Sequence, residues 1–189
     1  MLKFNRSDKN YAYLSINLQK RLLGGYVLRY HSTPEVGSGQ SVGEHTWRAC
    51  VILQTLWPDT SHEALLHMLY HDVAEAELGD LPSPVKLKYA GLAKEYSNVE
   101  KEYEKELGVH FSLNKKEAER CKMADMLESI LHCAQQLLLG NRLVLYVYTE
   151  SLKYMYDTFQ TNEDFQPVQC VLEDIQTAIK QHYNPQQVL

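Results

Sequence analysis

The sequence contains no long apolar run and no excess of positive charge. Its longest apolar block, LVLYVY at residues 143–148, is far shorter than the roughly eighteen residues needed to cross a bilayer. The first twenty residues contain no apolar stretch followed by small residues, so we expect no secretory signal peptide and a cytoplasmic location. The formal net charge of −5 and the isoelectric point near 5.9 argue against nucleic-acid polymers and anionic membranes as partners. Small phosphorylated ligands are compatible with this charge, because they need only a few local cations.

Cysteine, glycine and proline are also scarce. The four cysteines form no C-x-x-C pair, which argues against a disulfide framework or a cysteine-ligated zinc site and predicts free, buried thiols. The few glycines and prolines mark the breaks between longer segments. With 44% hydrophobic and 23% charged residues, the chain of 189 residues has the composition of one globular domain, which we expect to span residues 1–189.

The segments between the breaks are typical of helices, and the expected fold class is all-α. We expect helices at about 10–23, 41–57, 60–78, 85–107, 114–139, 142–159 and 166–182. Ser41-x-x-Glu44 and Thr60-x-x-Glu63 have the form of capping boxes that begin the second and third of these helices. Residues 26–40 are rich in Gly, Ser and Pro and are expected to form an ordered loop. The block LVLYVY has the composition of a strand, but no partner strand is visible.

The adjacent pair His71-Asp72 is the most informative chemical feature of the chain. It offers one neutral nitrogen and one anionic oxygen, which suits divalent ions of intermediate hardness such as Mn, Co, Fe, Ni or Zn. On a continuous helix over 62–78, Glu75 lies one turn beyond both residues and shares their face. Three ionisable side chains on one patch of an otherwise apolar helix are costly unless a metal or a partner compensates them.

Two further residues fit a metal site together with this pair. His45 lies one turn into the helix that begins at Ser41, and Asp125 lies in the middle of the helical stretch AERCKMADMLES. Taken singly, a His near a helix start is commonly a surface or capping residue, and a mid-helix Asp is commonly solvated or ion-paired. Taken together, the four side chains predict one metal site.

Neighbouring ionisable residues have simpler interpretations. His67 and His71 are four residues apart, but Met68 stands where the metalloprotease motif requires Glu, so we expect His67 to pack beside the site. Glu77 is expected to face solvent, and Arg48 to form a structural ion pair.

Glu44-His45, His71-Asp72 and Asp125, in this order and context, resemble the HD-domain metal-dependent phosphohydrolases. The segments SVGEHTWRA, LYHDVAEAELGDLPSPVK and KMADMLE are similar to the small bacterial 5'-deoxynucleotidases of the YfbR type and to their phage relatives, which include HD-type dATP triphosphohydrolases. The resemblance runs from about Arg29 to Glu128, and GDLPSPVK is its most family-specific part. It implies an HD-domain helical bundle with a metal site in its core.

The resemblance implies that one divalent cation is held by His45, His71, Asp72 and Asp125. It also implies that Glu75 is the catalytic carboxylate. We expect this carboxyl group to protonate the leaving oxygen, a role that requires a raised pKa.

Contacts to the substrate are implied for five further residues, namely Arg29, Tyr30, Asp80, Lys86 and Lys122. Arg29 matches the position that binds phosphate, the two lysines are further phosphate candidates, and Asp80 would contact the sugar. Tyr30 stands where these relatives commonly carry Trp, so the resemblance does not imply that this protein shares their preference for a particular base or sugar. The simpler interpretations are surface cations for Arg29 and the lysines, and a hydrogen-bonded turn residue for Asp80.

We expect the protein to remove phosphate from 2'-deoxynucleoside 5'-monophosphates. The first alternative is a triphosphohydrolase of deoxynucleoside triphosphates, dATP above all. The second is a catalytically silent nucleotide-binding regulatory module, against which the complete ligand set and Glu75 argue. The family also implies a homodimer or a higher homo-oligomer. The tyrosines of the last two helical segments form either that interface or helix–helix contacts, and they are Tyr146, Tyr148, Tyr154 and Tyr156.

Overall fold

The computed structural model describes residues 9–30 and 32–182, and this part of the chain is helical apart from turns, loops and one isolated bridge between Leu28 and Ser41. The helices are α1 (Lys9–Gly24), α2 (Val42–Leu56), α3 (His62–Tyr70), α4 (Glu75–Leu78), α5 (Ser83–Lys88), α6 (Ala90–Leu107), α7 (Lys115–Leu138), the 3-10 helix η1 (Arg142–Val144), α8 (Leu145–Phe159) and α9 (Gln166–His182). The predicted all-α class is confirmed, and LVLYVY lies in η1 and α8 rather than in a strand.

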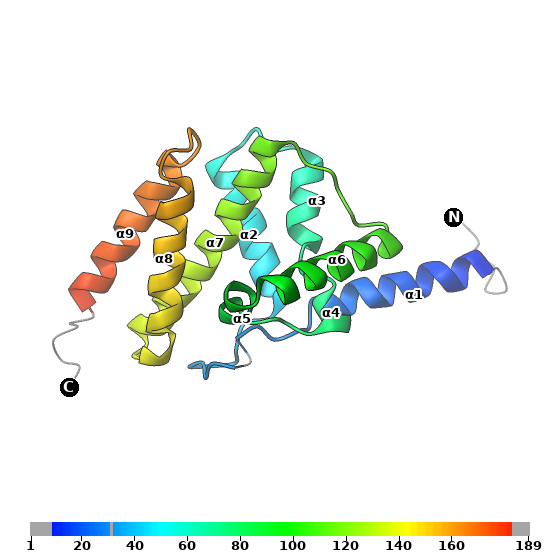
Figure 1. The fold of residues 1–189 in the computed structure, drawn as a ribbon, viewed down its shortest axis with the longest axis horizontal. Helices are drawn as coiled ribbons and strands as arrows, with labels where there is room; N and C mark the ends of the chain where they lie inside the picture. The colour runs from blue at the N-terminus through cyan, green and yellow to red at the C-terminus, as the bar shows by residue number, and fades with distance from the viewer. Residues whose placement is uncertain (1–8, 31, 183–189) are drawn as a thin grey trace, which may run out of the picture.

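Helix α7 lies at the centre of the bundle and packs against α2, α3, α8 and α9. Figure 1 shows α9 and α1 at opposite ends of the long axis, and α1 contacts α4 and α6. Five helices contribute apolar side chains to the core, since Leu53, Met68, Ile130, Met155 and Leu172 are each at most 1% exposed. Burial of these side chains is the main stabilising contribution to the fold. No helix of the described residues is both long and apolar enough to cross a membrane.

The ends of α2 and α7 lie where the sequence predicts them. The Ser41 hydroxyl accepts a hydrogen bond from the Glu44 amide at 3.1 Å. The Asn114 side chain accepts one from the Glu117 amide at 2.9 Å. These contacts satisfy amide groups that the first turn of a helix leaves without a partner.

The predicted cap at Thr60 is wrong by one residue. Ser61, with extended backbone, caps α3 by accepting a hydrogen bond from the Ala64 amide at 3.1 Å. The Thr60 hydroxyl instead donates to the Trp57 carbonyl at 2.6 Å, within the turn that follows α2. The helix cap that the sequence pattern assigned to Thr60 is therefore formed by its neighbour Ser61, while Thr60 stabilises the preceding turn.

The predicted continuous helix over 60–78 is also wrong. Helix α3 ends at Tyr70, residues 71–74 form a turn, and α4 begins at Glu75. In this turn the amides of Val73 and Glu75 donate to carbonyls three residues back, at 2.9 Å and 3.1 Å, as in a tightened 3-10 turn. Glu75 therefore reaches the neighbourhood of Asp72 through a turn, not along one face of a straight helix.

The segment predicted as one helix over 85–107 is likewise divided. Helix α5 already begins at Ser83, and Tyr89, with φ −122° and ψ 74°, separates it from α6. Pro84 lies in the first turn of α5, where a missing amide hydrogen costs no helical hydrogen bond. Helix α6 ends at Gly108, whose φ of 68° is the left-handed conformation that favours glycine at this position.

Candidate active site

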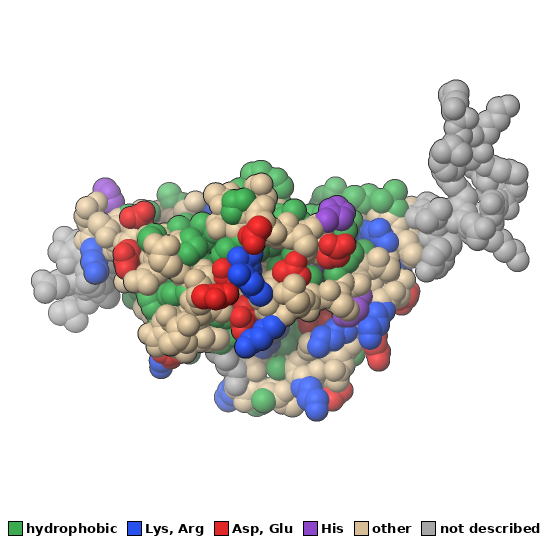
Figure 2. Space-filling view, turned by 90° about the horizontal axis from the view of Figure 1, so that it is seen from above, with side chains coloured by type: hydrophobic (Ala, Val, Ile, Leu, Met, Phe, Trp, Pro, Cys, Tyr) green, Lys and Arg blue, Asp and Glu red, His purple; other side chains and the backbone are tan. Residues whose placement is uncertain are grey.

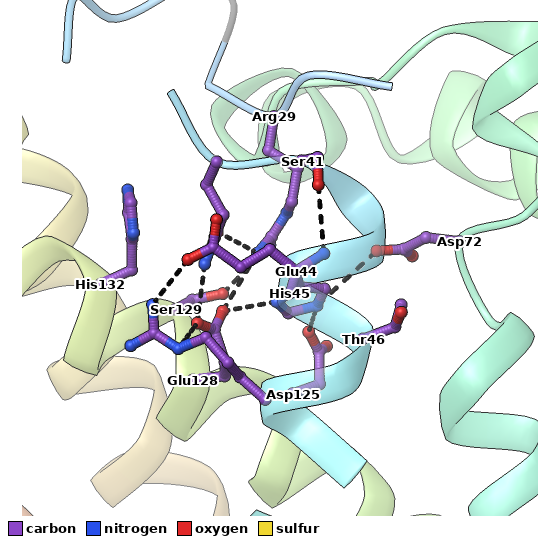
Figure 3. A network of polar contacts seen from close by, with 12 residues as sticks. Arg29, Ser41, Glu44, His45, Thr46, Asp72, Asp125, Glu128, Ser129 and His132 are labelled. Carbon is purple, nitrogen blue, oxygen red and sulfur yellow. Dashed lines mark hydrogen bonds and ion pairs between the residues drawn. The ribbon is translucent and has the colours of Figure 1, made fainter. Parts of the chain in front are cut away.

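Four predicted metal ligands converge from three parts of the bundle. His45 comes from α2, Asp72 from the turn after α3 and Asp125 from the middle of α7 (Figure 3). His71 precedes Asp72 in the same turn. One ligand atom from each of His45, His71 and Asp72 lies within 4.8 Å of the other two. The Asp125 Oδ1 atom lies 3.2 Å from His45 Nε2 and 3.8 Å from His71 Nε2. Asp125 is outside the group of three ligand atoms that lie within 4.8 Å of one another, but its carboxylate borders both imidazoles of that group.

Both imidazoles are oriented with Nε2 toward this group of ligand atoms. His71 Nδ1 donates to the Met68 carbonyl at 2.8 Å, and His45 Nδ1 lies 2.5 Å from Glu128 Oε2. The two Nε2 atoms are buried and form no hydrogen bond within the described structure. Although burial opposes its charge, Asp72 and Asp125 hold the pKa of His71 well above its usual value in the metal-free protein, so a metal would replace the proton on its Nε2. A neutral imidazole that donates through Nδ1 carries its lone pair on Nε2, which is the atom available to a metal. Two imidazole nitrogens beside two carboxylates fit a divalent transition ion.

The two aspartates stay ionised in spite of their burial. Burial alone would raise the pKa of both carboxyl groups, but His71 holds the pKa of Asp72 below its usual value. Lys122, and then the two imidazoles, hold the pKa of Asp125 well below its usual value. The cluster therefore presents negative charge that protons or a cation must balance.

Glu75 lies at the start of α4 and is only 5% exposed. Burial raises the pKa of its carboxyl group to about 8, and repulsion from Asp72 and Asp80 adds to this effect. Its Oε2 atom has no hydrogen-bond partner within the described structure. A carboxyl group that keeps its proton near neutral pH can act as a general acid.

A cavity of about 320 Å³ opens beside the cluster. His71, Asp72, Glu75 and Asp125 contribute to its wall. The five residues predicted to contact substrate line the same cavity, namely Arg29, Tyr30, Asp80, Lys86 and Lys122. Every side chain that the sequence singled out for substrate therefore faces one space.

The Arg29 guanidinium is held by polar partners at the edge of this cavity. Its Nη1 donates to Gln40 Oε1 at 3.0 Å and to Glu128 Oε2 at 3.3 Å, and its Nη2 donates to Ser129 Oγ at 3.2 Å. Although burial opposes its charge, neighbouring groups including Asp72 and Asp125 keep the pKa of Arg29 above its usual value. Arg29 is thus a partly buried, permanently charged group with fixed partners rather than an ordinary surface cation.

The other predicted substrate contacts have partners of their own. Lys122 Nζ lies 2.7 Å from Asp125 Oδ2, so this lysine is already paired with a candidate ligand. The Lys86 ammonium lies 5.2 Å from the centre of the Tyr96 ring. The Tyr30 ring stacks on His132 with centroids 5.1 Å apart, on a backbone with φ 54°, a conformation that is uncommon for residues other than glycine.

The residues given simpler interpretations also have defined places. The His67 ring centre lies 6.5 Å from that of His71, and burial lowers the pKa of His67 to about 4. Among the described residues, His67 is not part of the cluster of candidate ligands. Glu77 is exposed, and Arg48 pairs with Glu44 at 3.4 Å.

Sequence reasoning missed Glu128 and Glu100. Glu128 is fully buried on α7, three residues after Asp125, and contacts both Arg29 and His45. Its spacing from Asp125 on one helix is the signal that would have placed it near the site. Glu100 on α6 lines the cavity as well, but no local pattern connects it with the residues of α2, α3 or α7.

This helical bundle, with His71-Asp72 and Asp125 lining one cavity and His45 buried beside Asp125, has the fold of the HD-domain phosphohydrolases. The cyanophage S-2L HD phosphohydrolase DatZ, solved with dA and one catalytic Zn²⁺ ion, superimposes with a TM-score of 0.61 at 18% identity, over 95% of this chain and 99% of that one. The PH0347 protein from Pyrococcus horikoshii OT3 superimposes with a TM-score of 0.59 at 18% identity, over 85% of this chain and 97% of that one. These structures establish the fold.

The family is established by sequence. The profile of the YfbR-like 5'-deoxynucleotidases matches residues 31–179, and the chain belongs to this family. The 5'-deoxynucleotidase of Vibrio atlanticus (strain LGP32) is 29% identical over 129 residues, which cover 55% of this chain and 66% of that protein. The 5'-deoxynucleotidase VV1113 of Vibrio vulnificus (strain YJ016) is 28% identical over 129 residues, with the same coverage. The match thus spans just under two thirds of the length of these relatives.

Proposed function

We propose that the protein is a divalent-metal-dependent phosphohydrolase that removes phosphate from 2'-deoxynucleoside 5'-monophosphates. The observation that carries this proposal is the cavity lined by His71, Asp72, Asp125 and Arg29. Behind it the buried His45 Nε2 lies 3.2 Å from Asp125 Oδ1. The names of the Vibrio relatives support the monophosphate substrate.

In this proposal the metal is held by His45, His71, Asp72 and Asp125. When bound there, a divalent ion would polarise a phosphoryl oxygen and lower the pKa of a nearby water. The planar fork of Arg29 would bind the remaining phosphate oxygens, since its charge is permanent and its position is fixed by three acceptors. Lys86 and Lys122 would supply further positive charge, and Tyr30 and Asp80 would contact the nucleoside.

Glu75 would donate the proton that the leaving group needs. A water molecule attacks phosphorus, the bond to the 5'-oxygen breaks, and the Glu75 carboxyl group transfers its proton to that oxygen. The proton released by the attacking water returns Glu75 to its neutral form, so that charge and protons balance. The raised pKa of about 8 supports this role, because the carboxyl group is then protonated at neutral pH.

The test is phosphate release from panels of dNMPs and dNTPs in the presence of Mn²⁺, Co²⁺ or Zn²⁺. We expect the wild type to release orthophosphate from dNMPs. The Asp72→Ala variant should lose both this activity and its bound metal. Loss of dNTPs with little action on dNMPs would establish the triphosphohydrolase instead, which the cations of the cavity favour as second candidate. Binding of metal and nucleotide without turnover of either panel would refute both activities and indicate the regulatory module.

Three broader features belong to the same proposal. We treat the described helices as one domain, because α7 contacts helices on both sides of the bundle.

We place the enzyme in the cytoplasm, in keeping with its four free thiols, of which Cys50 is half-buried and Cys170 is exposed. We also propose a homodimer or higher homo-oligomer, for which exposed Tyr146 and Tyr154 are candidates, whereas Tyr148 lies in the core. Light scattering coupled to size exclusion would measure the mass.

Lysine and arginine side chains are interspersed with acidic side chains on the face seen in Figure 2. Such a mixed surface provides no basic stripe on that face for a nucleic-acid polymer. It supports the proposal that the partner is a small nucleotide, bound in the cavity.

A further inference from the structure

Glu128 is the most completely hydrogen-bonded side chain near the cavity. Its carboxylate is 0% exposed and lies between α2, α7 and the loop that precedes α2 (Figure 3). Oε1 accepts from Gln40 Nε2 at 2.7 Å and pairs with Arg48 Nε at 3.1 Å. Oε2 lies 3.3 Å from Arg29 Nη1 and 2.5 Å from His45 Nδ1. Four donors therefore surround one carboxylate, and two of them, the guanidinium groups of Arg29 and Arg48, are permanently charged.

The contact with His45 determines which ring nitrogen faces the metal site. A carboxylate accepts hydrogen bonds and cannot donate them, so His45 must present Nδ1–H to Oε2. The lone pair of a neutral ring then lies on Nε2, which is buried and lies 3.2 Å from Asp125 Oδ1. A carboxylate behind a ligating imidazole also raises the basicity of the ring and so strengthens metal binding.

The contact with Arg29 ties the phosphate side of the cavity to the same atom. Arg29 belongs to the loop before α2, whereas His45 belongs to α2 itself and Glu128 belongs to α7. Because Oε2 faces both Arg29 Nη1 and His45 Nδ1, a shift of this one oxygen moves the guanidinium and the imidazole together. Gln40 strengthens the coupling, since its amide donates to Oε1 of Glu128 and accepts from Nη1 of Arg29.

We propose that Glu128 is a positioning residue that couples the metal site to the phosphate site. It sets the tautomer of His45 for metal binding, and with the same oxygen it sets the position of Arg29 for phosphate binding. The inference rests on the proposed function for the identity of the phosphate ligand. The effect on metal binding does not depend on turnover.

The first experiment is a Zn²⁺ titration of metal-free protein by calorimetry, comparing wild type with Glu128→Gln. The side-chain NH2 group of Gln is itself a donor, so the side chain can no longer accept hydrogen bonds at both of its ends. We therefore expect the Zn²⁺ affinity to fall about 10- to 100-fold. At saturating metal, KM for a dNMP should still be raised about tenfold, because Arg29 has lost an ionised partner. Glu128→Asp keeps the charge and should recover part of both losses.

Glu104→Gln is the matched control. Glu104 is a buried carboxylate on α6 with an exposed fraction of 8%, and it lies 2.9 Å from His110 Nδ1, so the same chemical change is made beside another imidazole. We expect this variant to lose stability while its Zn²⁺ affinity and KM stay at wild-type values. Equal Zn²⁺ affinity in wild type and Glu128→Gln would overturn the proposal, as would an equal loss in Glu104→Gln.

A second measurement does not require any variant to fold. In zinc-loaded wild type, nitrogen-15 NMR of the histidine side chains should show a proton on His45 Nδ1 and metal on Nε2. Metal on Nδ1 would refute the role of Glu128 regardless of activity. Wild type that binds Zn²⁺ through Nε2 but hydrolyses no nucleotide would instead refute the proposed function and leave the metal-positioning role of Glu128 standing.

Discussion

Glu75→Gln should stabilise the metal-free protein at neutral pH while it removes activity. In the folded protein burial raises the pKa of Glu75 from 4.5 to about 8. Between these two values the folded state keeps a proton that the unfolded chain releases, so stability falls as the pH rises through this interval. The stabilisation that comes from keeping Glu75 protonated in the folded state is fully present below pH 4.5, and it is completely lost above pH 8. Gln resembles the neutral carboxyl group in shape and does not titrate.

The size of the effect follows from the pH interval. From pH 5 to pH 7 the unfolded chain binds nearly one proton less than the folded protein, and each pH unit then corresponds to about 1.4 kcal/mol. The stability of Glu75→Gln relative to wild type should therefore increase by about 2 to 3 kcal/mol over this range. Urea unfolding of metal-free protein at pH 5, 6, 7 and 8 measures it directly. Addition of metal should shrink the difference, because a cation beside Asp72 offsets the repulsion that Asp72 exerts on Glu75.

Glu77→Gln is the control for this experiment. Glu77 lies on the same short helix but is exposed, so its replacement should leave the pH dependence of stability unchanged. Unfolding free energies of Glu75→Gln and wild type that run parallel from pH 5 to pH 8 would refute the assignment of a neutral, buried carboxyl group. A matching loss of kcat, about 100-fold or more, is the expected functional counterpart of removing a general acid.

Two further substitutions test other parts of the structure. Arg29→Ala should raise KM for a dNMP about 10- to 100-fold, as expected for a lost charge-assisted contact. Arg29→Lys should recover only part of the lost affinity. An unchanged KM in steady-state kinetics would show that Arg29 does not bind the phosphate. Ser61→Ala should lower the free energy of unfolding by about 1 kcal/mol, because Ser61 caps α3 through the Ala64 amide. If Thr60→Ala cost more than Ser61→Ala in the same urea titration, the assignment of the cap would be wrong.

The long helices were predictable because their signals are local. Asn114 and Gly108 lie next to the helix ends that they determine, and no glycine or proline interrupts α7 between its caps. The family resemblance gave the order of the candidate ligands for the same reason, since each lies in a short motif. Thr60 and Ser61 show the limit of such patterns. Both residue types are favoured at a helix N-cap, and only the backbone conformation decides which of the two caps α3.

The surroundings of Glu128 were not predictable from local patterns. Its partners Arg29, Gln40 and His45 are separated from it by 99, 88 and 83 positions along the chain. A glutamate in the middle of a helix is most often solvated, and its sequence neighbours give no sign of four distant donors. Only the packing of α2 and of the preceding loop against α7 turns it into the buried partner of two candidate site residues.

The turn at residues 71–74 explains why the site needs a broken helix. Since α3 ends at Tyr70, the Met68 carbonyl is one of the last four of the helix, which a helix end leaves without an amide partner. His71 Nδ1 uses this carbonyl at 2.8 Å, and its Nε2 is thereby directed to the cluster. In a continuous helix the Asp72 amide would compete for the same carbonyl, and the imidazole would lose the contact that sets its tautomer. The two imidazoles thus reach the same state by different means, His71 through the end of its own helix and His45 through a carboxylate of α7.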